Sequence, residues 1–224
     1  MNGIYIVQAG TGTDQIGRFD IMVDTDLNAI DSFTWQLVPI NNETCGKDEE
    51  MEQFINQYRV ETDKKYDRIV TRFTNCLTHP ARNQETALGN LIADILCDSL
   101  RVDLMLMGSG AIRSYGLGPV VHYQALVECL PYDETVYMLR VNGTQIERML
   151  LDGKALDKQK LYTIALSKFH YMNMQKFLNI SLEEIKINAP PRVLATSYRD
   201  IVEEYMMMNP HLSSEVEGRL IVKA

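Results

Sequence analysis

The feature that most constrains the fold is an apolar stripe in the middle of the chain. Its side chains repeat at the i, i+3, i+4, i+7 spacing of one helical face: Leu88, Leu91, Ile92, Ile95, Leu96 and Leu100. A helix with such a face must bury it against another element. The chain therefore has to build a packed core around this helix.

The segments after residue 66 alternate between strand-like and helical patterns. Strands are expected over residues 69–77, 103–107, 135–141 and 161–166, with a last strand over residues 219–222. Besides the striped helix, we expect helices over residues 122–130, 144–151 and 201–208. This order predicts a mixed α/β (α+β) domain over residues 67–224.

Residues 1–47 form a separate region of strands. Strand-like runs occupy residues 4–9, 16–23 and 30–40, and a solvated connecting helix with an acidic first turn is expected over residues 48–66. Three strands alone make a poor core, and the region opens at once on an apolar run. We therefore expect that its sheet partners lie upstream and that the chain is a fragment. We also expect self-association through strands 4–9 and 16–23, because unpartnered apolar edge strands pair with other chains.

Charge and composition narrow the classes of partner. The 224 residues carry a net charge of -8, so no global basic field attracts a polyanion, and we expect no nucleic-acid partner. No apolar run approaches the roughly 18 residues that a membrane span needs, so none is expected. The cysteines lack metal-ligand spacing. We expect no metal site in this chain and buried free thiols at Cys97 and Cys129.

A glycine-rich turn is the most suggestive local feature. Residues 107–113 place Gly108 and Gly110 directly after an apolar strand and end in Arg113, and such turns let backbone amides approach a ligand. The turn lacks the spacing of the phosphate-binding and dinucleotide-binding loops. A purely structural tight turn is the alternative.

Arginines and aromatic residues beside turns are the other candidates. Arg82 and Arg113 each lie just outside an apolar element, where a guanidinium could pair with a phosphate or carboxylate; the alternative is a surface arginine. Tyr132 follows Pro131 in a loop, where its ring could stack on a planar ligand or fold onto the core. A further aromatic group follows the strand that ends at residue 166, and core packing is its commoner role: Phe169, His170, Tyr171 and Phe177.

No reaction follows from these residues by themselves. The four histidines are isolated in the sequence, and neither a Ser-His-Asp order nor a Gly-x-Ser-x-Gly elbow is present. The residues alone therefore indicate an α/β domain with a site for a planar, anionic ligand.

Five motifs together resemble a known family. In chain order they are residues 85–94 (ETALGNLIAD), 108–113 (GSGAIR), 130–132 (LPY), 141–143 (VNG) and 217–219 (EGR). They resemble the carboxy-terminal domain of the 5′-nucleotidase family. Residues 6–10 and 16–18 look like the last strands of the family's amino-terminal metallophosphatase domain. The resemblance implies remnant strands over residues 1–47, a linker helix over residues 48–66 and a layered mixed-sheet substrate-binding domain over residues 67–224.

The resemblance also implies an activity for the whole protein. The family consists of phosphoric ester hydrolases that cleave nucleotides to nucleoside and phosphate, with two divalent metal ions and a bridging water in the amino-terminal domain. None of those metal ligands maps onto this sequence, so no catalytic residue is expected in this chain, and the chain alone should be inactive. The expected partner is a small-molecule nucleotide or nucleoside. A cytoplasmic and an exported location both stay open.

The family's substrate-binding positions map in part onto this sequence. Arg82 and Arg113 match substrate-binding arginines, and Tyr132 matches the phenylalanine that forms one face of an aromatic clamp. Phe177 is the candidate for the second ring, although residues 173–177 match the family's Gly-Gly-Asp-Gly-Phe segment poorly.

One departure concerns the glycine turn. Gly108 stands where the family has an asparagine that contacts the nucleoside. The alternative function is therefore a non-catalytic nucleoside- or anion-binding module, with a nucleotide sugar or a cyclic nucleotide among its candidate ligands.

Overall fold

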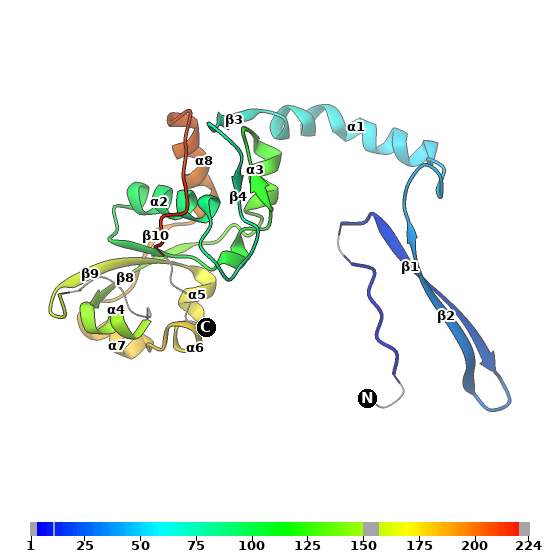
Figure 1. Ribbon diagram of the computed structural model, residues 1–224, viewed down its shortest axis with the longest axis horizontal. Coiled ribbons are helices and arrows are strands. Elements are labelled where there is room, and N and C mark those ends of the chain that lie inside the picture. Colours follow the sequence, from blue (N-terminus) through cyan, green and yellow to red (C-terminus); the bar gives the residue numbers. More distant parts are fainter. Residues whose placement is uncertain (1–3, 11, 150–156, 220–224) are drawn as a thin grey trace. The chain divides into compact units, whose positions relative to one another are not determined.

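The computed structural model describes residues 4–10, 12–149 and 157–219 (Figure 1). The chain divides into two compact units, Met1–Glu61 and Thr62–Ala224. Helix α1 (Glu49–Tyr66) crosses this boundary, and none of its residues is buried. The two units are described separately below.

The first unit is built on one long antiparallel hairpin. Strand β1 (Gln15–Asp24) pairs with β2 (Ala29–Pro39) over its whole length (Figure 1). The carboxylate of Asp24 closes the turn by accepting hydrogen bonds from the backbone N–H groups of Asp26 and Leu27, both at 2.9 Å. Trp35 lies across Gly17, where a Cβ atom would clash with the indole ring.

The expectation of a strand over residues 4–9 is wrong. Residues 4–10 have no strand conformation, and Ile4 and Ile6 are 75% and 83% exposed. Tyr5 contacts Phe33 through the rings, with centroids 4.0 Å apart. A strand needs a neighbour for its backbone N–H and C=O groups, and neither strand of the hairpin pairs with this segment.

The second unit is built around a mixed four-stranded sheet. Its strand order is β10 (Arg192–Ala195), β8 (Val136–Asn142), β9 (Leu161–Ser167) and β5 (Leu104–Leu106). The β10–β8 and β8–β9 pairs are antiparallel, whereas β9–β5 is parallel. Two short antiparallel pairs accompany the sheet: β3 (Ile69–Arg72) with β7 (Val120–His122), and β4 (Leu77–Thr78) with β6 (Gly116–Leu117).

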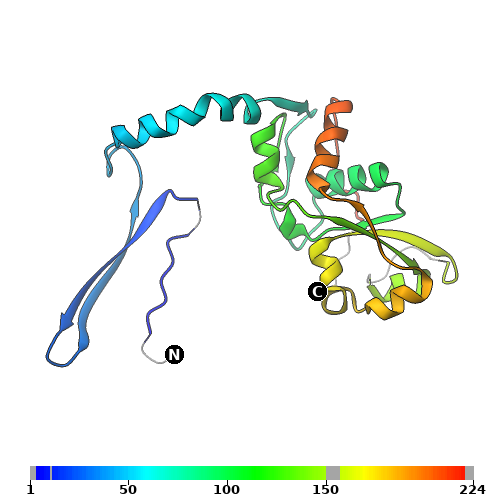
Figure 2. The ribbon, with the colours of Figure 1, turned by 180° about the vertical axis from the view of Figure 1, so that it is seen from behind.

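Helices cover both faces of this sheet, so the unit has three layers (Figures 1 and 2). Side chains on one face pack with α2 (Ala87–Leu100), α3 (Tyr123–Cys129) and α8 (Tyr198–Met208). Side chains on the other face pack with α4 (Gly143–Met149), α6 (Met174–Leu178) and α7 (Leu182–Asn188). Neighbouring β9 residues alternate between the two cores, with Ala165 in the first and Ile164 in the second. The predicted mixed α/β class is confirmed.

The striped helix is α2, and its stripe is buried as predicted except at Leu100, which is only partly buried. The Thr86 hydroxyl caps its amino terminus by accepting a hydrogen bond from Gly89 N–H. All four cysteines are free; Cys129 is buried, and Cys97 is partly buried. Burial raises the pKa of the Cys129 thiol to about 12, so this thiol is un-ionised and inert near neutral pH.

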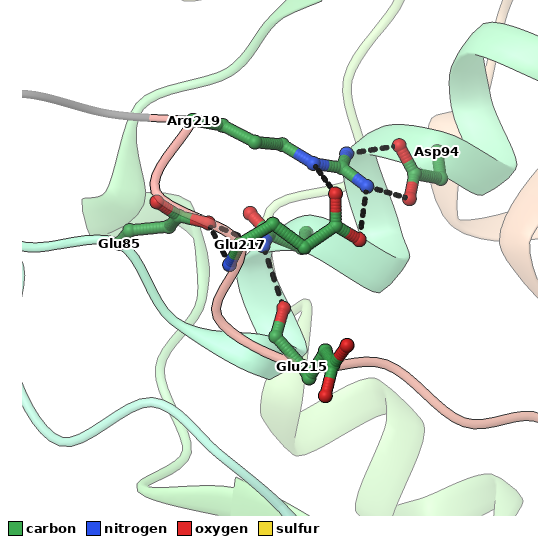
Figure 3. Close-up of polar contacts among 6 residues, drawn as sticks. Glu85, Asp94, Glu215, Glu217 and Arg219 are labelled. Carbon is green, nitrogen blue, oxygen red and sulfur yellow. Dashed lines mark hydrogen bonds and ion pairs between the residues drawn. The ribbon is translucent and has the colours of Figure 1, made fainter.

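The carboxy-terminal segment is fastened to α2 by a polar cluster (Figure 3). Arg219 bonds Asp94 of α2, at 3.0 Å for one of the two contacts, and also pairs with Glu217. Asn90 donates to the Glu85 carboxylate at 2.7 Å and to the Glu215 carbonyl oxygen at 2.8 Å. Residues from two of the motifs quoted above, 85–94 and 217–219, therefore hold residues 215–219 against α2.

Most of the other expected elements are present with shifted ends. The expected strand over residues 69–77 is split into β3 and β4, and the sequence analysis missed β6, β7, β10 and the helices of residues 168–188. The expected strand over residues 219–222 lies outside the described residues apart from Arg219, as does the end of the expected helix over residues 144–151. No helix in the described ranges is both long and apolar enough to cross a membrane.

Candidate functional site

A cavity of about 340 Å³ in the second unit is the best-formed candidate site. Its wall consists of Gly110, Ala111, Tyr132, Glu134, Ser167, Phe169, His170 and Tyr198. A larger hollow of about 550 Å³ lies on the first unit at Tyr5 and residues 30–33, but it is open and is formed by a two-stranded ribbon without a core. The smaller cavity combines apolar walls with a few convergent polar groups, as small-molecule sites do.

The glycine turn forms one wall, and His79 holds it in place. The turn follows β5 and contains a short 3-10 helix, Ser109–Ala111. The buried His79 ring lies 2.8 Å from Thr86 Oγ1 through Nδ1 and 3.1 Å from the Ser109 carbonyl oxygen through Nε2. Ser109 Oγ donates to the Arg82 carbonyl oxygen at 2.6 Å. The turn is thus tied to the segment that leads into α2.

The hydrogen-bond network assigns the tautomer of a neutral His79. The Ser109 carbonyl oxygen can only accept, so Nε2 carries the hydrogen, and Nδ1 of the neutral ring accepts from the Thr86 hydroxyl, which itself accepts from Gly89 N–H. Burial is the main cause that lowers the pKa of His79, and the nearby Arg82 charge adds to it, while the bond to Ser109 opposes it. A neutral imidazole therefore supports the turn.

The two predicted arginines lie beside the turn, outside the cavity wall. A Cβ atom at Gly110 would be 3.8 Å from Arg82 Nη1. The backbone N–H of Arg113 donates to the Cys129 carbonyl oxygen at 2.8 Å, and its guanidinium carbon lies 5.9 Å from the centroid of the Tyr132 ring. Both side chains are exposed, and neither forms an ion pair within the described part of the chain.

Tyr132 lines the cavity from a loop that α8 fastens. The ring is 50% exposed. On either side of it, Arg199 donates to the Leu130 carbonyl oxygen at 3.3 Å and to the Asp133 carboxylate at 3.2 Å. Because the arginine side chain is mostly buried, these two bonds restrict the loop and so the ring it carries.

Phe169 places a further aromatic ring on the cavity wall. It belongs to α5 (Lys168–Met172), which follows β9. Phe177, the ring expected from the sequence, is not part of the wall. The centroid of its ring lies 5.6 Å from that of the Phe169 ring. The structure thus brings Tyr132 and Phe169 to one cavity and places Phe177 as a neighbour of Phe169.

Gly108 is required by the position of His170. A Cβ atom at residue 108 would be 2.7 Å from His170 Cε1 and 2.9 Å from Nε2, closer than real side chains approach. The His170 ring is oriented by a 3.1 Å hydrogen bond between Nδ1 and Ser167 Oγ. Burial lowers the pKa of His170, although the Glu134 charge opposes this. The imidazole therefore fills the space beside the turn that a side chain at residue 108 would need.

Tyr198 and Glu134 complete the polar part of the wall. Tyr198 is 1% exposed, and its hydroxyl has no hydrogen-bond partner among the described residues. Burial is the first cause that raises its pKa, and the charges of Glu134 and Asp133 add to it, so the hydroxyl stays protonated. The Glu134 carboxylate accepts from Phe169 N–H at 3.0 Å, and its carbonyl oxygen accepts from Tyr198 N–H at 3.2 Å.

These contacts define what the site can do chemically. Tyr132 and Phe169 offer apolar surface to a planar ring. Arg82 and Arg113 lie beside the turn without ion-pair partners among the described residues, and their guanidinium groups suit an anionic group. Within the described ranges, no three His, Cys, Asp or Glu side chains are grouped so that they could hold a metal ion. The described residues at this cavity therefore form a candidate binding site.

Outside the glycine turn, five residues of the wall were not assigned a binding role from the sequence: Glu134, Ser167, Phe169, His170 and Tyr198. The aromatic cluster after β9 was a usable signal, because Phe169 and His170 belong to it. Tyr198 carried no signal, since it is the first residue of a helix nearly seventy positions after Tyr132.

A family profile matches most of the second unit. The profile described as the C-terminal domain of 5′-nucleotidase matches residues 69–206. This range contains the whole cavity wall. No curated protein sequence matches the chain.

Solved structures with the same fold include hydrolases from several organisms. The 5′-nucleotidase precursor of Thermus thermophilus aligns over 92% of this chain and 49% of its own, with a TM-score of 0.72 and 14% identity. The 5′-nucleotidase of Candida albicans aligns over 88% and 52%, with a TM-score of 0.62 and 13% identity. The sulfate thiohydrolase SoxB of Thermus thermophilus aligns over 92% and 44%, with a TM-score of 0.58 and 12% identity. The chain spans about half the length of these proteins, and at such identities the likeness concerns the fold.

Proposed function

Because the chain belongs to the 5′-nucleotidase family through its C-terminal domain, we propose that it is the nucleotide- or nucleoside-recognising part of a metal-dependent phosphoesterase that hydrolyses nucleotides to nucleoside and phosphate. The observation that carries this proposal is the cavity at the glycine turn. Its wall carries the rings of Tyr132 and Phe169. Arg82 and Arg113, which have no ion-pair partners among the described residues, lie beside the turn that forms part of this wall.

The binding roles follow from the positions of the side chains. A base would contact the ring of Tyr132, with Phe169 on the same cavity wall and Phe177 supporting it. Stacking of a base on an aromatic side chain is worth about 1–3 kcal/mol. Arg113 and Arg82 would bind phosphate or ribose oxygens at the edge of the turn. Gly110 lets the turn approach the ligand because it carries no side chain on the cavity wall, and Gly108 leaves room for the His170 ring beside the turn.

Calorimetric titration of the chain with AMP, adenosine and UDP-glucose tests the proposal. We expect saturable binding of at least one ligand, weakened about tenfold or more by Tyr132→Ala, which removes a stacking contact. Arg113→Ala should weaken AMP more than adenosine, because only AMP carries a phosphate. Tyr115→Ala and Arg192→Ala, exposed residues outside the cavity wall, are the matched controls and should bind as the wild type does. A folded chain that binds none of these ligands contradicts the proposal.

The catalytic part of the proposed enzyme lies outside the described residues of this chain. The proposal places two divalent metal ions, with the water that they activate, in another domain, to which residues 1–47 belong as terminal strands, with residues 48–66 as the linker. The described residues do not fit such a metal pair, because they contain no group of three potential ligands. The chain alone should therefore release no phosphate from AMP in the presence of divalent metals. Metal-dependent phosphate release by the purified chain would contradict this part of the proposal.

A non-catalytic binding module is the second candidate function. The observation that favours it is Gly108, whose side-chain space is filled by His170 from another element. A relative that had lost its enzymatic role could change its pocket in this way. The coding region upstream of this chain distinguishes the two: an Asp-x-His strand end and a Gly-His-x-His segment support the enzyme, and their absence supports the module.

We also propose self-association through the first unit. Apolar side chains of the hairpin and of residues 4–7 are exposed, among them Ile6 at 83% and Met22 at 65%. Each strand of the hairpin also has one edge without a strand partner among the described residues. Such edges pair with other chains. Sedimentation velocity at increasing concentration should show a rising average mass, whereas a monomer at every concentration contradicts the proposal.

A further inference from the structure

The Tyr198 hydroxyl is a buried polar group without a hydrogen-bond partner in the described protein. It belongs to the first residue of α8, and the residue is 1% exposed. Leaving a buried hydroxyl unpaired costs free energy, and native structures rarely do so without a reason. A phenylalanine would fill the same space without this cost.

No acceptor among the described residues bonds the Tyr198 hydroxyl. The carboxylate on the cavity wall, that of Glu134, accepts the Phe169 N–H group at 3.0 Å. The Asp133 carboxylate accepts from Arg199 at 3.2 Å. Burial first, and then the charges of Glu134 and Asp133, raise the pKa of Tyr198, so the hydroxyl keeps its proton and can donate it to an acceptor.

Tyr198 lies on the wall of the same cavity as Tyr132, Phe169 and the glycine turn. The hydroxyl oxygen itself has almost no accessible surface, so an acceptor that enters the cavity meets it only when the wall shifts as the ligand binds. Ring nitrogens and carbonyl oxygens are acceptors on the edge of a heterocyclic base, whereas the faces of the base are apolar and suit Tyr132 and Phe169. The position beside the turn that a side chain at residue 108 would occupy is closed by the His170 imidazole.

We propose that Tyr198 is a specificity-determining residue, whose hydroxyl donates a hydrogen bond to a ring nitrogen or carbonyl oxygen of the ligand's heterocyclic base. This inference rests on the proposed function, because it assigns a base to the cavity. The inference goes further than that function because it names the donor and the part of the ligand to which this donor binds. Ligands without a base gain nothing from this hydroxyl.

Tyr198→Phe tests the proposal, because it removes the hydroxyl and keeps the ring. Calorimetry should compare this variant with the wild type for AMP, GMP, UMP, CMP and ribose 5-phosphate. We expect at least tenfold weaker binding of one or more of the four nucleotides and unchanged affinity for ribose 5-phosphate. Tyr123→Phe changes a buried tyrosine outside the cavity wall and is the matched control, with wild-type affinities throughout.

The stability of the free protein separates a binding role from a structural one. Because the hydroxyl has no partner in the free chain, Tyr198→Phe should leave the thermal unfolding midpoint unchanged or raise it. A lower midpoint together with weaker binding overturns the proposal, since the hydroxyl would then support the fold. Equal affinity of wild type and variant for every nucleotide overturns it as well, while the proposed function stands. If the folded wild type binds none of these nucleotides, both fail.

Discussion

The two units of this chain contain similar apolar residues but use them differently. In the first unit, no described residue is buried, although its two strands pair along the hairpin with a single shift of register near the turn. In the second unit, two clusters of buried side chains lie on the two faces of one sheet. The difference shows that strand pairing alone does not make a core. A ribbon needs a second layer to remove its apolar face from water.

The largest difference in stability between the units is expected when one apolar side chain is truncated in each of them. Leu96→Ala opens a cavity in the core of α2, where the residue is 0% exposed, and should lower the free energy of unfolding by about 2–5 kcal/mol. Met22→Ala in the hairpin should change it by less than about 0.5 kcal/mol. Urea unfolding measures both changes, and similar values for the two variants would contradict the contrast.

Removing a cap or turn side chain should also cost more stability in the second unit than in the first. Thr86→Ala removes the cap of α2 and leaves Nδ1 of the buried His79 without a partner, so we expect a loss of about 1–2 kcal/mol. Asp24→Ala removes two hydrogen bonds from an exposed turn of the hairpin and should leave the main unfolding transition unchanged. Circular dichroism during urea unfolding measures both, and the comparison fails if the hairpin variant is the more destabilised one.

Acid should destabilise the second unit through the buried His79 and the partly buried His170. The pKa values of His79 and His170 are lowered in the folded chain, so the unfolded chain binds more protons below its own value of 6.5. Their contribution is therefore present above pH 6.5 and is lost as the pH falls through the lowered values. Arg82 faces His79, and Glu134 faces His170 and opposes its shift.

The measurement is the unfolding free energy at pH 7.5 and pH 5.5. The wild type should lose more stability than His79→Gln between these values, while the matched control His122→Gln, at an exposed position, should behave as the wild type does. An identical pH dependence in His79→Gln and wild type would contradict the assignment of a neutral His79.

The smallest effects are expected from exposed ion pairs. Arg219→Gln breaks the ion pairs of Arg219 with Asp94 of α2 and with Glu217. The free energy of unfolding should fall by about 0.2–1 kcal/mol at low salt and by less at high salt, because these groups are partly solvated. Arg18→Gln breaks the hairpin pair with Asp20 and should have no measurable effect. Unfolding at 20 mM and 500 mM NaCl compares them; a salt-independent loss in Arg219→Gln would contradict an electrostatic role.

Local patterns predicted the parts of the fold that are stabilised by neighbours in the sequence. The stripe of α2, the strands β8 and β9 and the helix α1 were expected from periodicity and charge alone, because each pattern reflects which face of an element is buried. The glycine turn and Tyr132 also stood out, since turn chemistry is local. Strand 4–9 was a wrong prediction for the complementary reason: an apolar run becomes a strand only when another strand pairs with it.

The makeup of the cavity wall depended on the tertiary structure. Periodicity and turn residues by themselves determined a mixed α/β domain with candidate binding residues at Arg82, Gly110, Arg113 and Tyr132. Only the folding of α5 and α8 against the turn placed Phe169, His170 and Tyr198 on the same wall. The physical reason is that a pocket is made of side chains from elements far apart in sequence, and packing around one core, which no local pattern encodes, decides which of them meet.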